Sequence, residues 1–228
     1  MSLILILIVA VFLTGCIETI NTPSASASGE TVNLPIPRLD SDFSLEKAIL
    51  QRRSVRSFGK GALTLAELSQ VLWAAQGVTD PSSGKRSAPS AGALYPLELY
   101  IVAGNVSELP PAVYKYKPAS HSLVRVKDGD FRQSLSRAAM GQSSVLQGAI
   151  DIVITAVYGR VTAKYGEWGT KFAHLEAGHA AQNVCLQVVA LGLGTVTVGS
   201  FEDASVQEVL GAAAGEIPLY ILPVGRTD

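Results

Sequence analysis

The sequence predicts one α+β domain, and three observations lead to this class. Two short segments, residues 113–117 and 122–126, alternate apolar and polar residues around a turn, which indicates an antiparallel hairpin. Residues 171–191 carry small or apolar residues spaced by threes and fours, which is typical of a long helix that ends at Gly192. The remaining strands and helices do not alternate strictly along the chain, which argues against a parallel sheet.

Local patterns place the other elements in order. Thr64 and Glu67 form a capping box that predicts a helix over 65–76, ended by Gly77. Further helices are expected at 45–51, 130–140 and 203–210. Further strands are expected at 97–102, 150–157, 195–198 and 219–224. Residues 79–96 are rich in Pro, Ser, Gly and Ala, and a loop of that length in a compact domain is usually functional or disordered.

Composition excludes some classes of partner. The chain has 228 residues, a formal net charge of -1, 48% hydrophobic residues and 16% charged residues. This charge balance does not suggest nucleic acid as a partner. Of the two cysteines, Cys185 falls inside the long helix, where we expect it to pack as a small apolar residue.

The N-terminus predicts a targeting segment. An unbroken apolar run from Leu3 to Leu13 suits a signal peptide, and the sequence that ends at Cys16 resembles a lipobox. We therefore expect a lipoprotein signal peptide at 1–15, lipidation at Cys16, a flexible tether at 16–38 and the folded domain at 39–228. This organisation predicts a lipid-anchored protein on the extracytoplasmic face of the cell membrane. The alternative is a short apolar anchor with an incidental cysteine.

Two familiar motifs are excluded by their spacing. Gly192 and Gly194 lie between a helix and a strand, the reverse of the order in a dinucleotide-binding fingerprint. His174, Glu176 and His179 invite a metal interpretation, but His174 and Glu176 point to different faces of the helix. The prediction is no metal site, with core or capping roles for these three side chains.

A basic cluster follows the first helix. Arg52, Arg53, Arg56 and Lys60 fall within nine residues, with Ser54 among them. Arginine binds phosphate oxygens through two donors at once, and a serine hydroxyl adds a neutral donor. The alternative is that these cations stabilise the carboxyl end of the helix. The excess of arginine over lysine favours phosphate binding.

Two further segments carry candidate chemistry. Residues 87–96 place small residues between two prolines, which lets backbone groups approach a flat ring closely. Lys164 and Tyr165, just before the long helix, offer a pair for proton transfer. The alternatives are an ordinary surface loop and two solvated side chains.

Together these segments resemble the nitroreductase family, and within it the SagB-type (ThcOx) dehydrogenases. The resemblance is carried in consistent order by RRSVR at 52–56, PSAGALYP at 89–96, KYGEWG at 164–169, HLEAGHAAQN at 174–183, LGLGT at 191–195 and PVGR at 223–226. It implies a nitroreductase-like fold, in which helices flank a central antiparallel sheet. It also implies a homodimer, with the long helix at its centre and two FMN molecules at the interface.

The resemblance also assigns residues to FMN. The residues that would hold its phosphate and ribityl chain are Arg52, Arg53, Ser54 and Arg56. The residues that would reach the flavin ring, from the other subunit, are Pro89, Ser90, Ala91, Gly92 and Leu94. Gly199 and Ser200 would present backbone N–H groups to flavin N5. Arg226 matches a late family motif and is assigned to the cofactor site as well.

The implied activity is an FMN-dependent oxidoreductase with hydride transfer at flavin N5. Lys164 and Tyr165 match the pair that azoline-oxidising members use, so the substrate could be an azoline peptide. The alternatives are a general nitroreductase or quinone reductase that acts on a small molecule, and a surface-tethered binding protein without catalysis.

Overall fold

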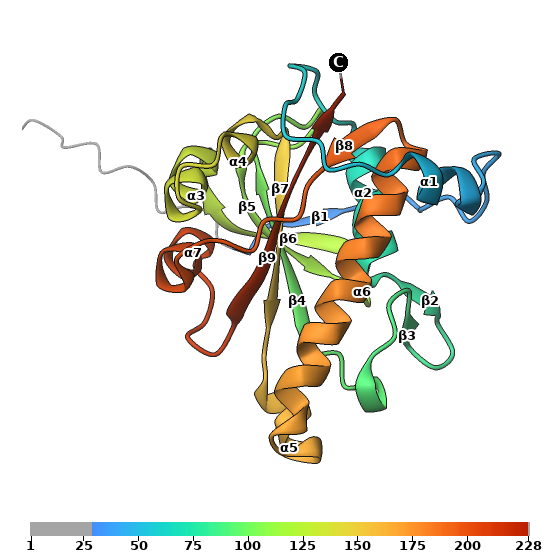
Figure 1. The fold of residues 1–228 in the computed structure, drawn as a ribbon, viewed down its shortest axis with the longest axis vertical. Helices are drawn as coiled ribbons and strands as arrows, with labels where there is room; N and C mark the ends of the chain where they lie inside the picture. Colours follow the sequence, from blue (N-terminus) through green and yellow to red (C-terminus); the bar gives the residue numbers. More distant parts are fainter. Residues whose placement is uncertain (1–28, 228) are drawn as a thin grey trace, which may run out of the picture.

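The computed structural model describes residues 29–227 and centres on a seven-stranded antiparallel sheet (Figure 1). The strands follow the order β1-β6-β5-β4-β7-β9-β8 across the sheet. Their bounds are β1 Thr31–Asn33, β4 Leu97–Ala103, β5 Ala112–Lys117, β6 Ser122–Asp128, β7 Ile150–Ala156, β8 Leu193–Thr195 and β9 Ile217–Arg226. A separate hairpin joins β2 (Val78–Asp80) to β3 (Lys85–Arg86). The predicted α+β class with a central antiparallel sheet is confirmed.

Helices cover both faces of the sheet (Figure 1). One face packs against α2 and α6, and the other against α3, α4 and α7. The helices are α1 Leu45–Gln51, α2 Leu65–Gln76, α3 Arg132–Ala138, α4 Ser143–Gln147, α5 Gly159–Tyr165, α6 Trp168–Ala190 and α7 Asp203–Leu210, with a 3-10 turn η1 at Ala91–Ala93. This two-sided burial explains why β7 is buried along its whole length.

The alternation of β7 divides the core into two halves. Ile152 and Ile154 belong to the core half beneath α6, whereas Val153 belongs to the half beneath α3 and α7. Asp151 is fully buried, and neither of its carboxylate oxygens has a hydrogen-bond partner among the described residues. Burial raises the pKa of Asp151 well above its ordinary value, against an opposing effect of Arg132. Asp151 is therefore a buried carboxyl whose charged form is disfavoured by burial.

Local sequence explains the helix ends. The Ser44 side chain accepts a hydrogen bond from the Lys47 N–H and so begins α1. Thr64 and Glu67 form the predicted reciprocal capping box at the start of α2. Gly211 ends α7 in the left-handed conformation, at φ 63°, which glycine adopts without strain. The boundaries predicted for these three helices are confirmed.

The predicted tether over 16–38 is wrong for its second half. β1 pairs with β6 through Thr31 to Asn33, and Leu34 is buried in the core. The Arg38 N–H donates to the Gln70 side chain at 2.7 Å. The folded unit therefore begins before residue 39, because this segment adds an edge strand to the sheet. Residues 1–28, with the predicted signal peptide and Cys16, lie outside the described residues.

Three other elements differ from the predictions. Residues 79–96 are not one loop, since the β2–β3 hairpin and η1 lie within them. The helix predicted at 130–140 is the shorter α3, and a turn at Met140 and Gly141, both at positive φ, separates it from α4, which was not predicted. β8 begins two residues and ends three residues earlier than predicted, and residue 198 forms only an isolated bridge to Ile221.

Candidate functional site

The predicted site residues lie at two ends of α6. Figure 1 shows α5, which carries Lys164 and Tyr165, at one end of this helix and α1 and β8 at the other. α6 has 23 residues, so it is about 35 Å long at 1.5 Å per residue. That length exceeds the reach of one FMN molecule. The chain therefore places the predicted phosphate group and the predicted ring group of residues at separate ends.

The segment after α1 lies along the outer edge of the sheet. Ser54 pairs in parallel with Thr195 of β8, and the Val55 N–H donates to the Thr195 carbonyl at 2.9 Å. Gly194 makes this approach possible, since a Cβ there would lie 2.8 Å from the Val55 side chain. Arg52, Ser54 and Arg56 are thus held in extended backbone beside the carboxyl end of α6.

The arginines of this segment have different partners. Arg53 donates to the Leu50 carbonyl at 2.9 Å and to the Arg52 carbonyl at 2.7 Å, so it stabilises the end of α1. Among residues 29–227, the guanidinium groups of Arg52 and Arg56 form neither a hydrogen bond nor an ion pair. The helix-end alternative therefore describes Arg53, whereas Arg52 and Arg56 can bind an anion.

Arg52 also faces the long helix. Burial raises the pKa of the Cys185 thiol in α6, and the charge of Arg52 partly offsets that rise. Cys185 itself is only 7% exposed, as expected for a small residue that packs in the core. The cation of Arg52 therefore lies near the same face of α6 that meets α1.

Arg226, predicted at the cofactor site, has partners within the fold. Its guanidinium donates to both carboxylate oxygens of Glu67, at 2.6 and 2.8 Å, and to the Ala62 carbonyl at 2.9 Å. These bonds occupy the fork that a phosphate would need. Arg226 thus fastens the last strand to the start of α2, and its place in the cofactor site stays a prediction.

Gly92 brings the loop around η1 into contact with Lys164 and Tyr165. A Cβ at Gly92 would lie 2.7 Å from the Tyr165 hydroxyl and 3.0 Å from the Lys164 ammonium. Lys164 Nζ lies 5.3 Å from the centre of the Tyr165 ring, and Tyr165 packs edge-on against Phe172. The ring group of residues, Pro89, Ser90, Ala91 and Leu94 included, is therefore joined to the proton-transfer pair within one chain. Both side chains lie on α5 rather than in a loop.

Gly199 and Ser200 form an exposed turn between β8 and α7. A Cβ at Gly199 would meet only Tyr220, at 3.9 Å, so this turn is open to solvent. The Ser200 carbonyl accepts a hydrogen bond from the Gln142 side chain at 3.1 Å, which fixes the turn from the side of α4. Its backbone N–H groups are accessible to a ligand.

His174, Glu176 and His179 of α6 differ in burial, and only Glu176 has the predicted core position. His174 is exposed, and its Nε2 lies 2.6 Å from the Tyr158 hydroxyl, with the two rings edge to face. Glu176 is buried at 2% exposure, whereas His179 is exposed. The predicted core or capping roles are therefore wrong for the two histidines. In the described part of the chain, no three His, Cys, Asp or Glu side chains are grouped to hold a metal ion.

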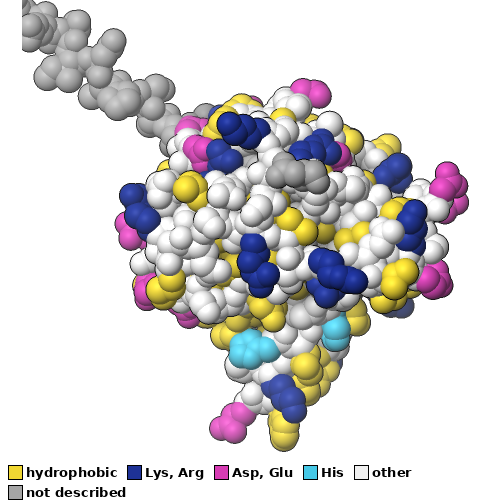
Figure 2. Space-filling model, turned by 45° about the horizontal axis from the view of Figure 1, so that its top comes forward, with side chains coloured by type: hydrophobic (Ala, Val, Ile, Leu, Met, Phe, Trp, Pro, Cys, Tyr) yellow, Lys and Arg dark blue, Asp and Glu magenta, His cyan; other side chains and the backbone are white. Residues whose placement is uncertain are grey.

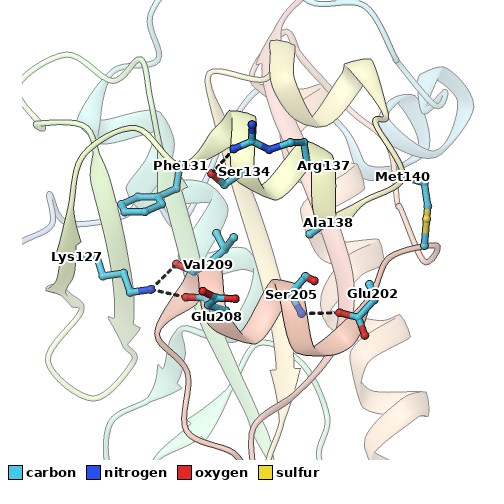
Figure 3. Close-up of a pocket in the computed structure, with 10 residues that line it drawn as sticks. All are labelled: Lys127, Phe131, Ser134, Arg137, Ala138, Met140, Glu202, Ser205, Glu208 and Val209. Carbon is cyan, nitrogen blue, oxygen red and sulfur yellow. Dashed lines mark hydrogen bonds between the residues drawn. The ribbon is translucent and has the colours of Figure 1, made fainter.

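A hollow of about 540 Å³ lies between α3 and α7 and contains no predicted site residue (Figure 3). Its charged groups serve the ends of α7. Lys127 donates to the carbonyls of Glu208 and Val209, and Glu202 accepts from the Ser205 N–H at 2.6 Å. The charged groups of the hollow therefore serve the packing of α7, and we do not assign the hollow as a binding site.

The fold and these two groups of residues define a class of flavin-binding oxidoreductases. A model of the nitroreductase family matches residues 49–226, and the chain belongs to this family. A protein of Methanocaldococcus jannaschii described as a nitroreductase, MJ1384, is 43% identical over 198 residues, which cover 87% of this chain and 98% of that protein. The chain is therefore an oxidoreductase, and the alternative of a binding protein without catalysis is wrong.

Two further similarities extend this assignment. The crystal structure of a Ralstonia eutropha protein described as a nitroreductase superposes with a TM-score of 0.77 and 28% identity, over 90% of this chain and 93% of that one. The microcin B17-processing protein McbC of Escherichia coli is 29% identical over 157 residues, which cover 66% of this chain and 57% of McbC. This chain thus spans part of the length of McbC.

The predicted location at the cell membrane is corrected. Between residues 29 and 227, no helix combines the length and apolar character that a membrane crossing requires. The relatives named above are described by their enzymatic or processing roles, and nothing in these similarities points to a lipid anchor or to the extracytoplasmic face. Membership of the family therefore gives no support to the predicted lipid-anchored location.

Proposed function

We propose that this chain is an FMN-dependent oxidoreductase that works as a homodimer, with each flavin site built from both subunits. The separation of the two predicted groups of residues along α6 supports this arrangement. Arg52, Ser54 and Arg56 lie at one end of the helix, and Gly92, next to Lys164 and Tyr165, lies at the other. A two-fold axis that crosses α6 brings the first end of one copy to the second end of its partner.

The chain offers groups that suit both the phosphate and the flavin ring of FMN. Arg52 and Arg56 would bind phosphate oxygens through guanidinium groups that have no partner among the described residues. The exposed turn at Gly199 and Ser200 would orient the flavin edge through backbone N–H groups. When bound, FMN would supply hydride transfer at its N5 atom. Arg226 is left out of this set because Glu67 occupies it.

Exposed apolar side chains support the homodimer. On α1, Leu45, Ile49 and Leu50 are 58–72% exposed, and on α6 Trp168 and Leu175 are 65% and 53% exposed. Hydrophobic side chains are likewise exposed in several places on the face drawn in Figure 2. Clusters of large exposed apolar residues mark interfaces in otherwise soluble folds. A second copy that packs across α1 and α6 would cover the exposed apolar side chains of both helices.

Lys164 and Tyr165 would handle the proton of the substrate. The Tyr165 hydroxyl points at the strained loop, and the Lys164 ammonium lies near its ring. Such a pair can take or return a proton at Tyr165 Oη. The substrate would be a small molecule such as a nitro compound or quinone, as the 43% identity to a nitroreductase favours.

A second candidate substrate is a peptide azoline, oxidised to an azole as in the SagB-type branch. The Lys164–Tyr165 pair and the similarity to McbC favour it, since McbC is named for processing microcin B17. Azoline oxidation needs a base that removes a ring proton, and Tyr165 could serve as this base. Reduction of a dye by reduced flavin needs no such base.

The direct experiment is a titration of the purified full-length protein with FMN, followed by absorbance and sedimentation. We expect a yellow dimer that holds one FMN per subunit. A protein that binds no FMN contradicts the cofactor proposal, and a monomer with bound FMN contradicts the shared site. For the substrate class, Lys164→Ala combined with Tyr165→Phe should abolish azoline oxidation and leave dye reduction within about twofold, a difference below 0.5 kcal/mol in the barrier.

A further inference from the structure

The loop over Lys164 and Tyr165 is strained. Gly92, Ala93 and Tyr95 all have positive φ, at 61°, 53° and 45°. For the two residues with a Cβ, such a conformation costs on the order of 1–3 kcal/mol each and persists only where the surroundings enforce it. The surroundings of the loop must therefore contain groups that hold it in this form.

Tyr95 is held at each of its polar groups. Its N–H donates to Ser90 Oγ at 2.9 Å, its carbonyl accepts from Arg160 at 3.0 Å, and its hydroxyl accepts from the Arg86 N–H at 3.2 Å. The Arg86 guanidinium lies over the Tyr95 ring, 4.3 Å from its centre. Ser90 and Arg86 thus hold Tyr95 in place, and through these two residues the interior of the protein contacts the loop.

Glu176 lies on α6, which packs against both η1 and α2, the helix that carries Gln76. It is 2% exposed, and its Oε1 has no hydrogen-bond partner among the described residues. The Gln76 Nε2 and Ser87 Oγ atoms are also buried and unpartnered, and Arg86 donates to the Gln76 Oε1 at 3.1 Å. Burial raises the pKa of Glu176, and nearby Ser90, Gln76 and Arg86 only partly offset the rise.

We propose that Glu176 is a positioning residue, whose buried carboxyl holds Ser90 and Gln76 and so keeps the loop of residues 89–96 against Lys164 and Tyr165. The Ser90 hydroxyl and the Gln76 amide can both donate to the carboxyl oxygens of Glu176. The bond from Gln76 Nε2 would satisfy an otherwise unpaired buried amide. The role of the loop in catalysis rests on the proposed function, whereas the role of Glu176 in holding the loop does not.

Amide hydrogen exchange of the full-length protein tests the geometry without any cofactor. Glu176→Leu keeps the side-chain bulk and removes the donor and acceptors, whereas Glu176→Gln keeps a donor and an acceptor. We expect exchange in residues 89–96 to rise about fivefold in Glu176→Leu and to stay within about twofold in Glu176→Gln, as the loss of one hydrogen bond near 1 kcal/mol predicts. Exchange in α7 should not change in either variant.

Asp151 provides the matched control, since it is also a buried carboxyl without a partner but lies in the other half of the core. Asp151→Val should leave exchange in residues 89–96 at the wild-type rate. Ser90→Ala is the second variant, useful if Glu176→Leu does not fold, and it should loosen the loop as Glu176→Leu does. Wild-type exchange in Ser90→Ala, or loosening in Glu176→Gln equal to that in Glu176→Leu, overturns the proposal.

The catalytic consequence is read separately. With FMN bound, kcat for azoline oxidation, the reaction that needs Lys164 and Tyr165, should fall about tenfold in Glu176→Leu and Ser90→Ala and stay within about twofold of the wild type in Glu176→Gln, with an unchanged KM. Dye reduction, which needs neither side chain, should stay within about twofold in Glu176→Leu. If the protein binds no FMN, the proposed function fails while the exchange result still decides the role of Glu176. If exchange responds as expected but kcat does not, the loop does not limit the reaction and the positioning role is overturned.

Discussion

Arg226 and Glu67 form a two-pronged ion pair that joins the end of the last strand to the capping box of α2. The two pairs of atoms lie 2.6 and 2.8 Å apart, although 159 residues separate the partners in the sequence. Burial alone would raise the pKa of Glu67, but the hydrogen bonds from Arg226 and Thr64 lower it overall. The pair therefore closes the fold by linking β9 to the first long helix.

Arg226→Ala should destabilise the fold without weakening FMN binding. Loss of hydrogen bonds between charged groups costs about 1.5–3 kcal/mol of unfolding free energy. Urea unfolding measures this change, and the control is Arg137→Ala, at an exposed position of α3, which should stay within about 0.5 kcal/mol of the wild type. A weaker affinity for FMN with unchanged stability would restore Arg226 to the cofactor site.

Arg52→Ala should show the reverse behaviour. Its guanidinium supports nothing in the described fold, so stability should change by less than about 0.5 kcal/mol. The dissociation constant of FMN should rise about 10- to 100-fold, as expected for a lost charge-assisted contact to phosphate. Titration by flavin fluorescence measures the affinity. In Arg53→Ala, the dissociation constant of FMN should stay closer to the wild-type value than in Arg52→Ala, because Arg53 stabilises the end of α1.

Gly92→Ala should reduce activity by displacing the proton-transfer pair. The new methyl group would collide with the Tyr165 hydroxyl and the Lys164 ammonium. Gly84→Ala is the matched control, since Gly84 also has positive φ, 69°, but a Cβ there meets nothing within 4 Å. Both variants should lose about 1 kcal/mol of stability from backbone strain. Only Gly92→Ala should lower kcat, by about tenfold or more, and equal activities would show that the contact is unimportant.

His121 should make the fold less stable in mild acid. Its Nε2 lies 3.1 Å from the Pro35 carbonyl and 2.7 Å from Ser69 Oγ, and its Nδ1 lies 2.8 Å from the Tyr116 hydroxyl. Burial lowers the pKa of His121, against a smaller opposing effect of Pro35. The unfolded chain therefore binds the proton more readily than the folded one. Stability should be full above about pH 6.5 and fall as the pH drops below that value.

Urea unfolding at pH 7.5 and pH 5.5 checks this behaviour. The wild type should be less stable at the lower pH, and His121→Gln should lose most of the difference. His179→Gln, on the exposed side of α6, should keep it. A pH dependence that persists unchanged in His121→Gln would place its origin elsewhere.

The sequence predicts best those features that depend on neighbouring residues. Thr64 with Glu67, Ser44 and Gly211 set helix ends through contacts of a few residues, and the structure confirms them. β1 has only three residues, too few for an alternating pattern, so its pairing with β6 depends on long-range contacts. The sequence also did not predict that Lys164 and Tyr165 belong to a helix, α5, because Gly159 and Gly166 on either side suggest a loop.

The candidate site was predictable as a set of residues but not as an arrangement. The pattern of arginines at 52–56 could not separate Arg53, bound to carbonyls of α1, from Arg52 and Arg56. The partner of Arg226 depends on the pairing of distant elements. The burial of Glu176 follows from how α6 meets α2 and the loop of residues 89–96, which no local pattern encodes.

The length of α6 has a genetic consequence. If one end of the helix binds the phosphate and the other end serves the partner's flavin, a subunit with Arg52→Ala and a subunit with Lys164→Ala are each inactive alone as azoline oxidases. A mixed dimer of the two has one site with both defects and one site with neither. Coexpression in equal amounts should therefore restore about a quarter of the wild-type activity, since half of the dimers are mixed and each has one intact site. Two alleles that fail separately would complement each other within one protein.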